Sequence, residues 1–399
     1  MNGQETHPKL AALQTRGLIA GVVGLILCGV GFTTDSEQFY HSYLTGYLYW
    51  VAIAVGCLGW CMINHLTEGH WGLPARRIWE AASRTIPLLA ILFLPIWFGM
   101  DHIFSWTHAD PSDEILAGKA TYLNSTFFTV RALIYFGLWI LFATLLSRFS
   151  MSQDSDDQAN YDVWAFRLRK VSGPGLLFMA LSVTFYSVDW VMSLDPHWFS
   201  TLFGFLFAAS DLLAAMAFTI VMVKILEHTS PLDKLLKVQH YHDYGNLLMA
   251  TVMLWAYMSF SQYLIIWSGN TQEEAPWYLA RTGDGWVIIS VILIAFHFML
   301  PLLVLLTRRT KRASHHLVKI AIYMLVMRFV DLYWLVTPSF SHGGTVELHL
   351  SSIWYDLAGL LAVGGLWLAY FAMNLKNKEL VPLSDKRLQE ALEGTGGHH

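Results

Sequence analysis

Residues 188–200 read VDWVMSLDPHWFS and place a carboxylate, Asp189, at the end of an otherwise apolar helical stretch. Asp195 is a good helix N-cap and the proline after it fits a first helical turn, so we expect a new helix to begin within about one turn. A looser copy at residues 330–341 (VDLYWLVTPSFS) has the same seven-residue step from its acid, Asp331, to its proline. Acidic side chains that recur at one membrane depth in apolar helices predict a functional site.

The composition is that of a polytopic membrane protein. Hydrophobic residues make up 55% of the 399 positions and charged residues only 14%, and the mean hydropathy is +0.44. A helix needs about 20 apolar residues to cross a bilayer, and ten segments are long enough. They are residues 16–33, 42–64, 85–104, 125–148, 171–193, 200–226, 245–268, 284–307, 317–336 and 352–373. The predicted fold class is therefore all-α with ten transmembrane helices.

The basic residues predict which side of the membrane each connection faces. Counted along the chain, 21 of the 25 Lys and Arg residues fall in the N-terminus, the even-numbered connections and the tail, whereas only Lys119 and Arg281 fall in the odd-numbered connections. Basic residues accumulate on the cytoplasmic side, so both termini are expected there. The predicted parts are an N-terminus (1–15), a membrane domain (16–373) and a tail (374–399). The N-terminus lacks a cleavable-signal pattern, so the first helix is expected to be retained.

The chain also contains an internal repeat. The end of the third segment (WFGMDHIF) aligns with the end of the seventh (YMSFSQYL) at an offset of 160 residues, and the fourth aligns with the eighth at the same offset. The repeat predicts two four-helix bundles, residues 42–193 and 200–336, flanked by the first and last helices. Chance similarity between apolar helices is the competing explanation.

Several ionisable side chains fall inside the predicted helices, and we take them as the candidate proton path: Asp101, His102, Arg131, Asp189, Asp211, His297, Arg328 and Asp331. A charge near a helix centre costs about 2.5 to 3.5 kcal/mol to insert, so such residues usually face a bundle interior or water and have a partner. Most of them fall toward the outer leaflet, which predicts a polar pocket open to that side. Arg328 and Asp331 are three residues apart and are expected to form an ion pair. For Asp189, proton transfer and a structural pair with Arg131 are both open.

Asp211 and His297 fall nearer the middle of the membrane. Further titratable residues are expected on the cytoplasmic side: Glu227, His228, His240, Tyr241, His242 and Asp243. Together they are candidates for a proton path from the inner side, because titratable groups with water between them relay protons. The alternative is a core histidine bonded to a backbone carbonyl, beside a solvated interfacial cluster.

No redox cofactor is expected in this chain. Haem b would need paired histidines at matching depth on facing helices, and no helix carries two well-spaced interior histidines. The sequence contains no Cys-x-x-Cys-His and no iron–sulfur spacing. The three cysteines, Cys28, Cys57 and Cys61, all lie in the first two helices, so a disulfide framework is not expected. Cys57 and Cys61 share a helix face, and we interpret them as packing thiols rather than metal ligands.

Two runs carry a resemblance to a known family: residues 189–204 (DWVMSLDPHWFSTLFG) and 255–267 (WAYMSFSQYLIIW). With them, nearly the whole chain resembles the F-type membrane subunits (ActF) of bacterial alternative complex III, a quinol:cytochrome c oxidoreductase. These belong to the polysulfide-reductase type (NrfD-like) of membrane subunit, which has ten helices and two four-helix bundles. The resemblance implies a location in the bacterial cytoplasmic (inner) membrane.

The resemblance also implies partners. They are a paralogous ten-helix quinol-binding subunit, an iron–sulfur subunit, pentahaem and monohaem cytochromes c, lipids and a terminal oxidase. Haem c and iron–sulfur clusters would reside in those partners, and no nucleic acid is expected. The leading hypothesis is a cofactor-free, non-catalytic subunit that conducts protons. The alternatives are a subunit with its own quinol site near the outer leaflet, with Asp189 or His102 as proton acceptor, and a stand-alone secondary transporter.

Overall fold

Ten apolar helical spans make up the computed structural model, which describes residues 8–110, 112–156, 160–283, 285–340, 352–376, 378–382 and 384–388. Eight spans are essentially single helices: α1 (Pro8–Thr34), α2 (Ser36–Thr67), α8 (Ser125–Ser155), α9 (Tyr161–Trp190), α10 (Phe203–Leu226), α12 (Val238–Gly269), α17 (Ser314–Val336) and α18 (Ile353–Lys376). No strand occurs in these ranges. The predicted all-α fold and the ten spans are confirmed.

Two spans are built from several pieces. The third consists of α3 (Arg76–Ser83), α4 (Ile86–Leu92), α5 (Leu94–Phe98) and α6 (Met100–Ile103). The eighth consists of α14 (Trp286–Ile292), the π-helical segment η5 (Leu293–Met299) and α15 (Leu300–Leu306). Proline explains the starts of α4, α5 and α15, because it lacks the N–H that a continuous helix needs and Pro87, Pro95 and Pro301 each stand in the first turn of a piece.

Short elements connect the spans. They are η1 (His70–Gly72), η2 (Ser105–His108), α7 (Glu114–Lys119), η4 (Met192–Leu194), α11 (Leu232–Leu235), α13 (Ala275–Ala280), α16 (Arg308–Arg312) and η6 (Thr337–Phe340). Polar side chains start several helices: the carboxylate of Asp35 accepts a 3.0 Å hydrogen bond from the Gln38 amide at the start of α2, and Asn124 caps α8 through the Phe127 amide at 2.8 Å.

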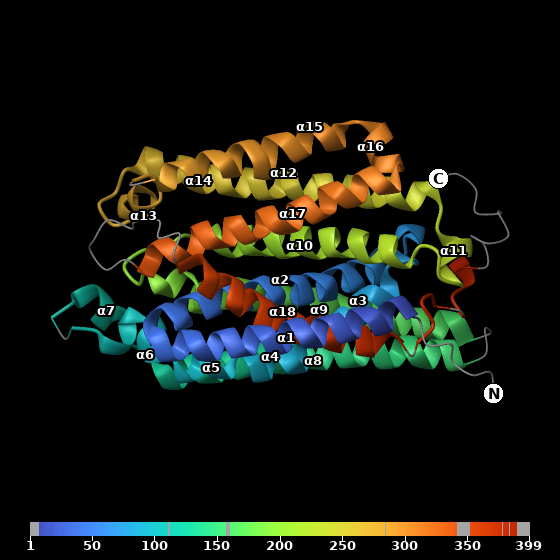
Figure 1. The fold of residues 1–399 in the computed structure, drawn as a ribbon, viewed down its shortest axis with the longest axis horizontal. Helices are drawn as coiled ribbons and strands as arrows, with labels where there is room; N and C mark the ends of the chain where they lie inside the picture. The colour runs from blue at the N-terminus through green and yellow to red at the C-terminus, as the bar shows by residue number, and fades with distance from the viewer. Residues whose placement is uncertain are drawn as a thin grey trace.

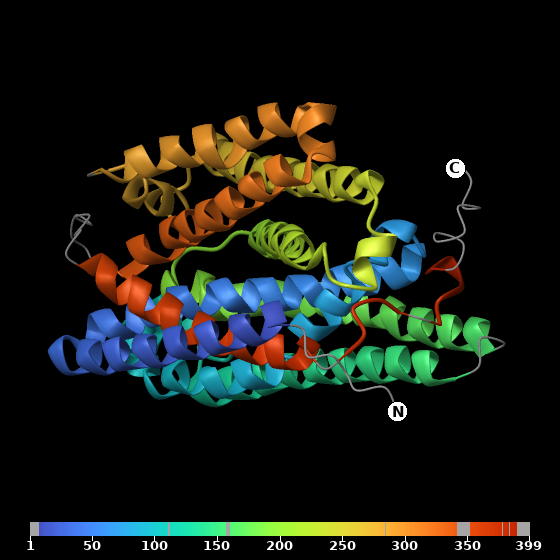
Figure 2. The same ribbon diagram turned by 45° about the vertical axis from the view of Figure 1, so that its right-hand side comes forward.

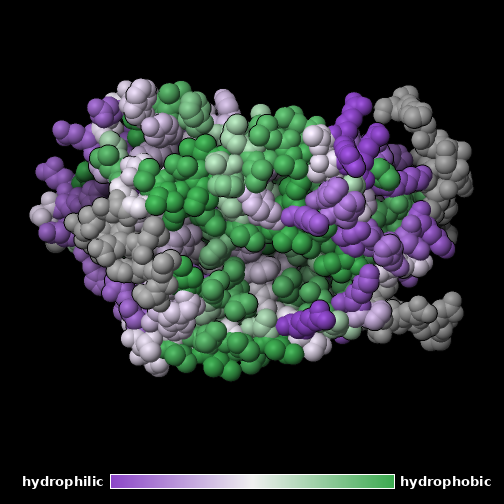
Figure 3. Space-filling model, turned by 45° about the horizontal axis from the view of Figure 1, so that its top comes forward, coloured by the Kyte–Doolittle hydropathy of each residue, from purple (hydrophilic) through white to green (hydrophobic). Residues whose placement is uncertain are grey.

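The helices run side by side with their long axes roughly aligned (Figure 1). A band of apolar side chains lies between polar ends on the face shown in Figure 3, as expected for a protein that crosses a bilayer. The chain is therefore a multi-pass integral membrane protein. Lys9, near the start of α1, bonds the carbonyl of Ile225 at the end of α10, and Lys376, at the end of α18, bonds Gln14. We call this end the terminal end and the opposite one the distal end.

The helices form two groups. In the first, α2 packs on α3 and α9, and α8 packs on α9; in the second, α12, the pieces of the eighth span and α17 pack together beside α10. Helix α10 also packs on α2 and α9, so it joins the two groups, as the two ribbon views show (Figures 1 and 2). Helices α1 and α18 lie outside both groups and pack on each other, with α18 against α2.

Small residues allow α1 and α18 to touch backbone to backbone. Gly17, Gly21 and Gly24 lie on one face of α1, one turn apart. A Cβ atom added at Gly24 would lie only 2.2 Å from the Ala362 amide nitrogen, and one at Gly365 would lie 2.1 Å from the Gly21 nitrogen. Such small-residue faces let membrane helices associate by close packing, without a hydrophobic driving force.

The predicted helix boundaries are wrong mainly at the terminal end. The third, fifth and seventh spans begin at Arg76, Tyr161 and Val238, seven to ten residues earlier than predicted. Most of residues 149–170, which separate the predicted fourth and fifth spans, therefore belong to the end of α8 and the start of α9. Hydropathy marks only the part of a helix that lies in hydrocarbon, so it misses polar turns beyond it. Likewise α1 begins at Pro8, inside the predicted N-terminal segment 1–15.

The predicted helix start at Asp195 is also wrong. The segment after η4 is a loop, and α10 begins only at Phe203. The Asp195 carboxylate instead accepts a 2.8 Å hydrogen bond from the Ser339 hydroxyl and lies 3.9 Å from Nη1 of Arg281, so it ties the two groups of helices together at the distal end. The two copies of the repeat still share a shape, because α9 and α17 are each followed by a short 3-10 turn.

Candidate functional site

Helix α9 carries a row of buried polar side chains along its inner face. Ser172, Ser182, Tyr186 and Asp189 are all buried, and their spacing puts them on one side of the helix. At 1.5 Å per residue, the row extends over about 25 Å, most of the thickness of the hydrocarbon core. We call these four residues the polar column.

The distal end of the column is an ion pair. Arg131 Nε on α8 donates a 2.8 Å hydrogen bond to Oδ2 of Asp189, and the Tyr135 hydroxyl donates one of 2.6 Å to the same oxygen. The guanidinium also donates to the Tyr122 carbonyl at 2.8 Å, and its carbon lies 3.8 Å from the centre of the Tyr122 ring. Asp189 is completely buried. The pair with Arg131, one of the two open possibilities for Asp189, is therefore present.

Aromatic rings enclose the next residue, Trp190. It is fully buried, and its ring contacts those of Tyr47, Phe93, Tyr135, Phe136, Trp139 and Tyr186. Buried rings of this size exclude lipid and bulk water from the inside of the first group. The carboxylate of Asp189 therefore lies away from water, and the Arg131 guanidinium compensates its negative charge.

The middle of the column meets the first helix of the second group. The Tyr186 hydroxyl donates a 2.6 Å hydrogen bond to Oδ2 of Asp211 on α10. Helices α2 and α10 touch at the same level, because a Cβ atom at Gly56 would lie 2.1 Å from the Asp211 carbonyl oxygen. Oδ1 of Asp211 is buried and has no hydrogen-bond partner among the described residues. Asp211 thus keeps one unused acceptor at the junction of α2, α9 and α10.

A second set of charges lies beyond Asp211. Arg328 interacts with Asp211 electrostatically and forms a direct ion pair with Asp331, which confirms the pair predicted from their spacing. The indole of Trp255 donates to Oδ2 of Asp331 at 3.3 Å, and the His297 ring lies 4.2 Å from that of Trp255. We call Trp255, His297, Arg328 and Asp331 the second-bundle cluster.

His297 lies within the π-helical segment η5, a rare geometry that is often found at functional positions. The Arg328–Asp331 pair acts on it electrostatically. Six of the eight predicted site residues are therefore buried and take part in polar contacts distributed over both groups of helices, which we call the buried network: Arg131, Asp189, Asp211, His297, Arg328 and Asp331.

The other two predicted residues lie elsewhere. Asp101 and His102 are exposed at the end of the third span, and the His102 ring stacks on Tyr40 with 5.1 Å between ring centres. The His102 carbonyl lies 3.0 Å from Nε2 of His41. The structure places both residues at the distal surface, so the expected outer pocket does not include them.

The predicted inner path through the second group is interrupted. Glu227, just after α10, bonds Lys224 and accepts a 2.7 Å hydrogen bond from Tyr241. Burial acts to raise the pKa of Glu227, but the bonds from Lys224 and Tyr241 outweigh it and hold the pKa below its usual range. Between this cluster and Asp211, the inward side chains of α10 are apolar except for one threonine, Thr219, whose hydroxyl is bonded to Trp79. The buried face of α9 instead carries polar side chains near both of its ends, with an apolar stretch between Ser172 and Ser182.

Buried and half-buried charges close the terminal end of the first group. They are Arg76, Arg77, Glu80, Asp154, Asp385 and Arg387, which we call the terminal cluster. Three guanidinium groups and three carboxylates balance one another. Removing one partner from such a set is costly, because it leaves a buried charge without compensation.

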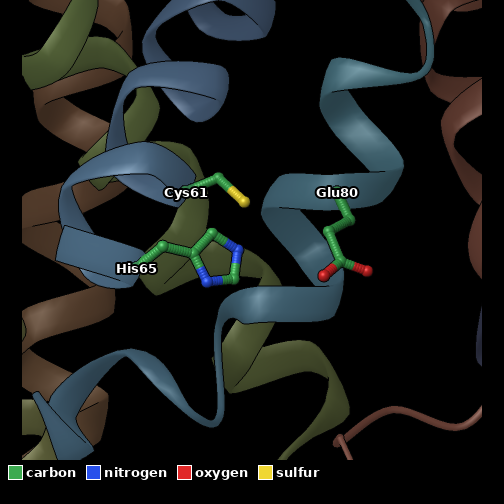
Figure 4. A group of neighbouring side chains, drawn as sticks. All are labelled: Cys61, His65 and Glu80. Carbon is green, nitrogen blue, oxygen red and sulfur yellow. The ribbon is translucent and has the colours of Figure 1, made fainter. Parts of the chain in front are cut away.

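Cys61 and His65 on α2 face Glu80 on α3 (Figure 4), and the potential ligand atoms of the three residues lie within 4.8 Å of one another. Both carboxylate oxygens of Glu80 are taken, because Nε of Arg76 lies 3.2 Å from one and Nη1 of Arg77 lies 2.5 Å from the other. A metal ion at this position would face two guanidinium groups at short range. The chemistry of the donor set therefore favours an ion-pair cluster over a metal centre.

The sequence analysis missed several members of this network, chiefly Tyr135, Tyr186, Trp255 and the terminal cluster. The three- and four-residue spacing of Ser182, Tyr186 and Asp189 was the signal available for the column. The partners of Asp189 are 54 and 58 positions away, and no local pattern connects them.

Comparison with models of known protein families finds no match to this chain, and comparison with curated proteins finds no relative.

Proposed function

We propose that this chain is a membrane subunit of a quinol:cytochrome c oxidoreductase and that it conducts protons along the polar column of α9. The observation that carries the proposal is the buried, hydrogen-bonded Tyr186–Asp211 pair, which connects the column to the second-bundle cluster. Buried ionisable groups that face a bundle interior are characteristic of proton relays and ion pathways. The chain supplies such groups at several depths.

One stretch of the column has to be hydrated for conduction. Between Ser172 and Ser182 the buried face of α9 offers only Gly175 and Met179, over about 15 Å. Methyl groups of methionine fill this stretch: the Met62 Cε atom would lie 2.8 Å from a Cβ at Gly175, and that of Met179 would lie 2.7 Å from a Cβ at Gly59. Methionine side chains are flexible, so they can move aside and admit water.

The resemblance supports the proposed setting in a bacterial cytoplasmic membrane with both termini inside. The proposed partners are a paralogous quinol-binding subunit, an iron–sulfur subunit, cytochromes c and a terminal oxidase, which would hold the redox centres. Proton movement against the membrane potential costs about 2.3 kcal/mol per charge per 100 mV, so it would depend on redox chemistry in those partners.

The test replaces Asp211 by Asn in the purified, reconstituted complex. Asn keeps an acceptor for the Tyr186 hydroxyl but cannot carry a proton, so we expect the proton-to-electron ratio to fall while electron transfer continues. The matched control is Asp101→Asn, which changes an exposed acid at the distal surface. An unchanged ratio in both Asp211→Asn and Asp189→Asn would exclude conduction through this network.

A groove favours a second candidate, a quinol site of this subunit's own. It has a volume of about 420 Å³, opens on the outside of α10 and α12 in their distal halves, and is lined by Leu202, Phe205, Tyr257, Met258, Ser261, Leu264 and Ile265. The hydroxyls of Tyr257 and Ser261 are its polar groups, and neither Asp189 nor His102 reaches it. A photoreactive quinone analogue tests this candidate: labelling of α12 that Ser261→Phe abolishes would support it, and labelling confined to other subunits would contradict it.

A further inference from the structure

The chain returns over the first group of helices after α18. Leu380, Val381 and Leu388 are buried, and the segment lies against the ends of α8 and α9 (Figure 2). The Ser384 hydroxyl donates to the Asp154 carbonyl at 3.2 Å, and Lys386 lies 3.1 Å from Asp162. This part of the sequence was predicted as a polar tail, but its described residues are part of the packed structure.

Asp385 holds the segment in place. It is completely buried, accepts a 3.2 Å hydrogen bond from Nη1 of Arg76, and accepts bonds of 2.9 and 2.6 Å from Arg387. Arg76 belongs to α3 and also donates to Ser150 and Gln153 on α8. The tail is thereby tied to two helices through one carboxylate.

A small cavity of about 10 Å³ lies directly under this attachment. Its lining includes His65, Arg76, Gln153, Leu168 and Arg387. Nε2 of His65 and Nη1 of Arg387 are buried and have no hydrogen-bond partner among the described residues. A cavity of this size, with polar walls, accommodates about one water molecule. Arg387 supplies one wall, so the tail completes the cavity.

The cavity lies at the terminal end of the polar column. Leu168 lines it and is one turn before Ser172 on the same face of α9. His65 reaches it from α2, on the same face as Cys61 one turn deeper in the group. The next buried polar side chain along α9 from the cavity is therefore Ser172, the first residue of the column.

We propose that residues 384–388 form a latch over the terminal mouth of the polar column, and that His65 exchanges protons with the aqueous phase when the latch opens. The exchange of protons depends on the proposed conduction along α9, whereas the latch itself does not. With the latch closed, Arg387 forms part of the wall of the cavity that His65 lines, and the His65 side chain is buried.

Thiol labelling tests the latch independently of proton transfer. The probe is His65→Cys in a chain whose three native cysteines are replaced, treated with a membrane-impermeant thiol reagent in the intact complex. Asp385→Ala, or a stop after Leu380, is expected to speed labelling at least about tenfold, because the buried guanidinium groups lose their partner. The matched control is Lys234→Ala, which changes an exposed lysine of α11 outside the latch and is expected to leave the rate unchanged.

Equal labelling rates in chains with the native tail and in chains with the altered tail would overturn the latch. Cys61, alone on a Cys28→Ser, Cys57→Ala background, provides a second probe with native His65, so that a folding defect of the His65→Cys chain cannot decide the result. If labelling accelerates, the passive proton permeability of proteoliposomes is compared for the wild type and Asp385→Ala. A permeability increase that Asp211→Asn removes would support the exchange through His65. An unchanged permeability would overturn that exchange and leave the latch standing.

Discussion

The Tyr186 hydroxyl donates a 2.6 Å hydrogen bond to Oδ2 of Asp211, and this bond joins the last helix of the first group to the first helix of the second. Both side chains are buried, and the other carboxylate oxygen of Asp211, Oδ1, has no hydrogen-bond partner among the described residues. A polar contact of this kind fixes how α9 and α10 are rotated relative to each other, because an unpaired buried carboxyl is costly. The contact therefore serves the packing of the helices and the proposed relay alike.

Tyr186→Phe is expected to destabilise the protein by about 1 to 3 kcal/mol, because it leaves the Asp211 carboxyl without its donor. Unfolding in mixed detergent micelles measures the change. Tyr355→Phe is the control, since the Tyr355 hydroxyl contacts Thr34 at 2.9 Å at an exposed position. Equal effects of the two substitutions would contradict the role given to the buried bond.

Asp189→Ala is expected to cost about 3 to 5 kcal/mol, because the Arg131 guanidinium then stays buried without its carboxylate. The double variant Arg131→Met, Asp189→Leu replaces the pair by apolar side chains and should lose clearly less than the sum of the single changes. The same unfolding assay completes this double-mutant cycle. If the free-energy changes of the two single variants simply added up to that of the double variant, the two residues would not depend on each other.

Gly24→Ala is expected to weaken the packing of α1 on α18 and cost about 1 to 3 kcal/mol, because the new methyl group would overlap the backbone of Ala362. Gly29→Ala, in the same helix, is the control, since nothing lies within 4 Å of its added Cβ. There the better helix propensity of alanine predicts no loss. A comparable loss at both positions would mean that helix α1 does not need small residues for contact.

Met179→Ala is expected to raise the passive proton permeability of reconstituted vesicles, because it removes one of the side chains that fill the dry stretch of the polar column. Met253→Ala in α12 is the matched control, since that side chain is exposed on the outside of the helix. The stopped-flow decay of a pH gradient measures permeability. Identical decay in both variants would show that Met179 does not limit hydration of the column.

The latch should respond to acid. Burial acts to raise the pKa of Asp385, but Arg387 and Arg76 outweigh it and hold the pKa below its usual range. A carboxyl with a lowered pKa stabilises the folded state above the ordinary value of about 3.9, and this contribution is lost as the pH falls through the lower, folded value. The anisotropy of a dye at Lys386→Cys, with the native cysteines replaced, should therefore be constant near neutral pH and fall below about pH 4. A transition near pH 7, or the same acid transition in Asp385→Asn, would contradict this origin.

The prediction from sequence worked where the signal is local. About twenty consecutive apolar residues in lipid form a helix, because a helix satisfies the hydrogen bonds of all its backbone groups within the segment. The ten spans and the Arg328–Asp331 pair, three residues apart on one helix, depend on nothing more distant. The positions of the helix ends beyond the hydrocarbon were predicted wrongly, because hydropathy marks only the residues that lie in the lipid.

The sequence by itself determined the class of protein, the number of spans and the identity of six buried ionisable residues. Apart from the Arg328–Asp331 pair, only the tertiary structure decided which partners the buried polar side chains have. It placed Arg131 against Asp189, Tyr186 against Asp211, and Asp385 of the tail against Arg76, across separations of 58, 25 and 309 positions. The reason is physical: a helix forms from its own neighbouring residues, but the rotation of each helix, and hence which side chains meet, is set by the packing of all the helices together.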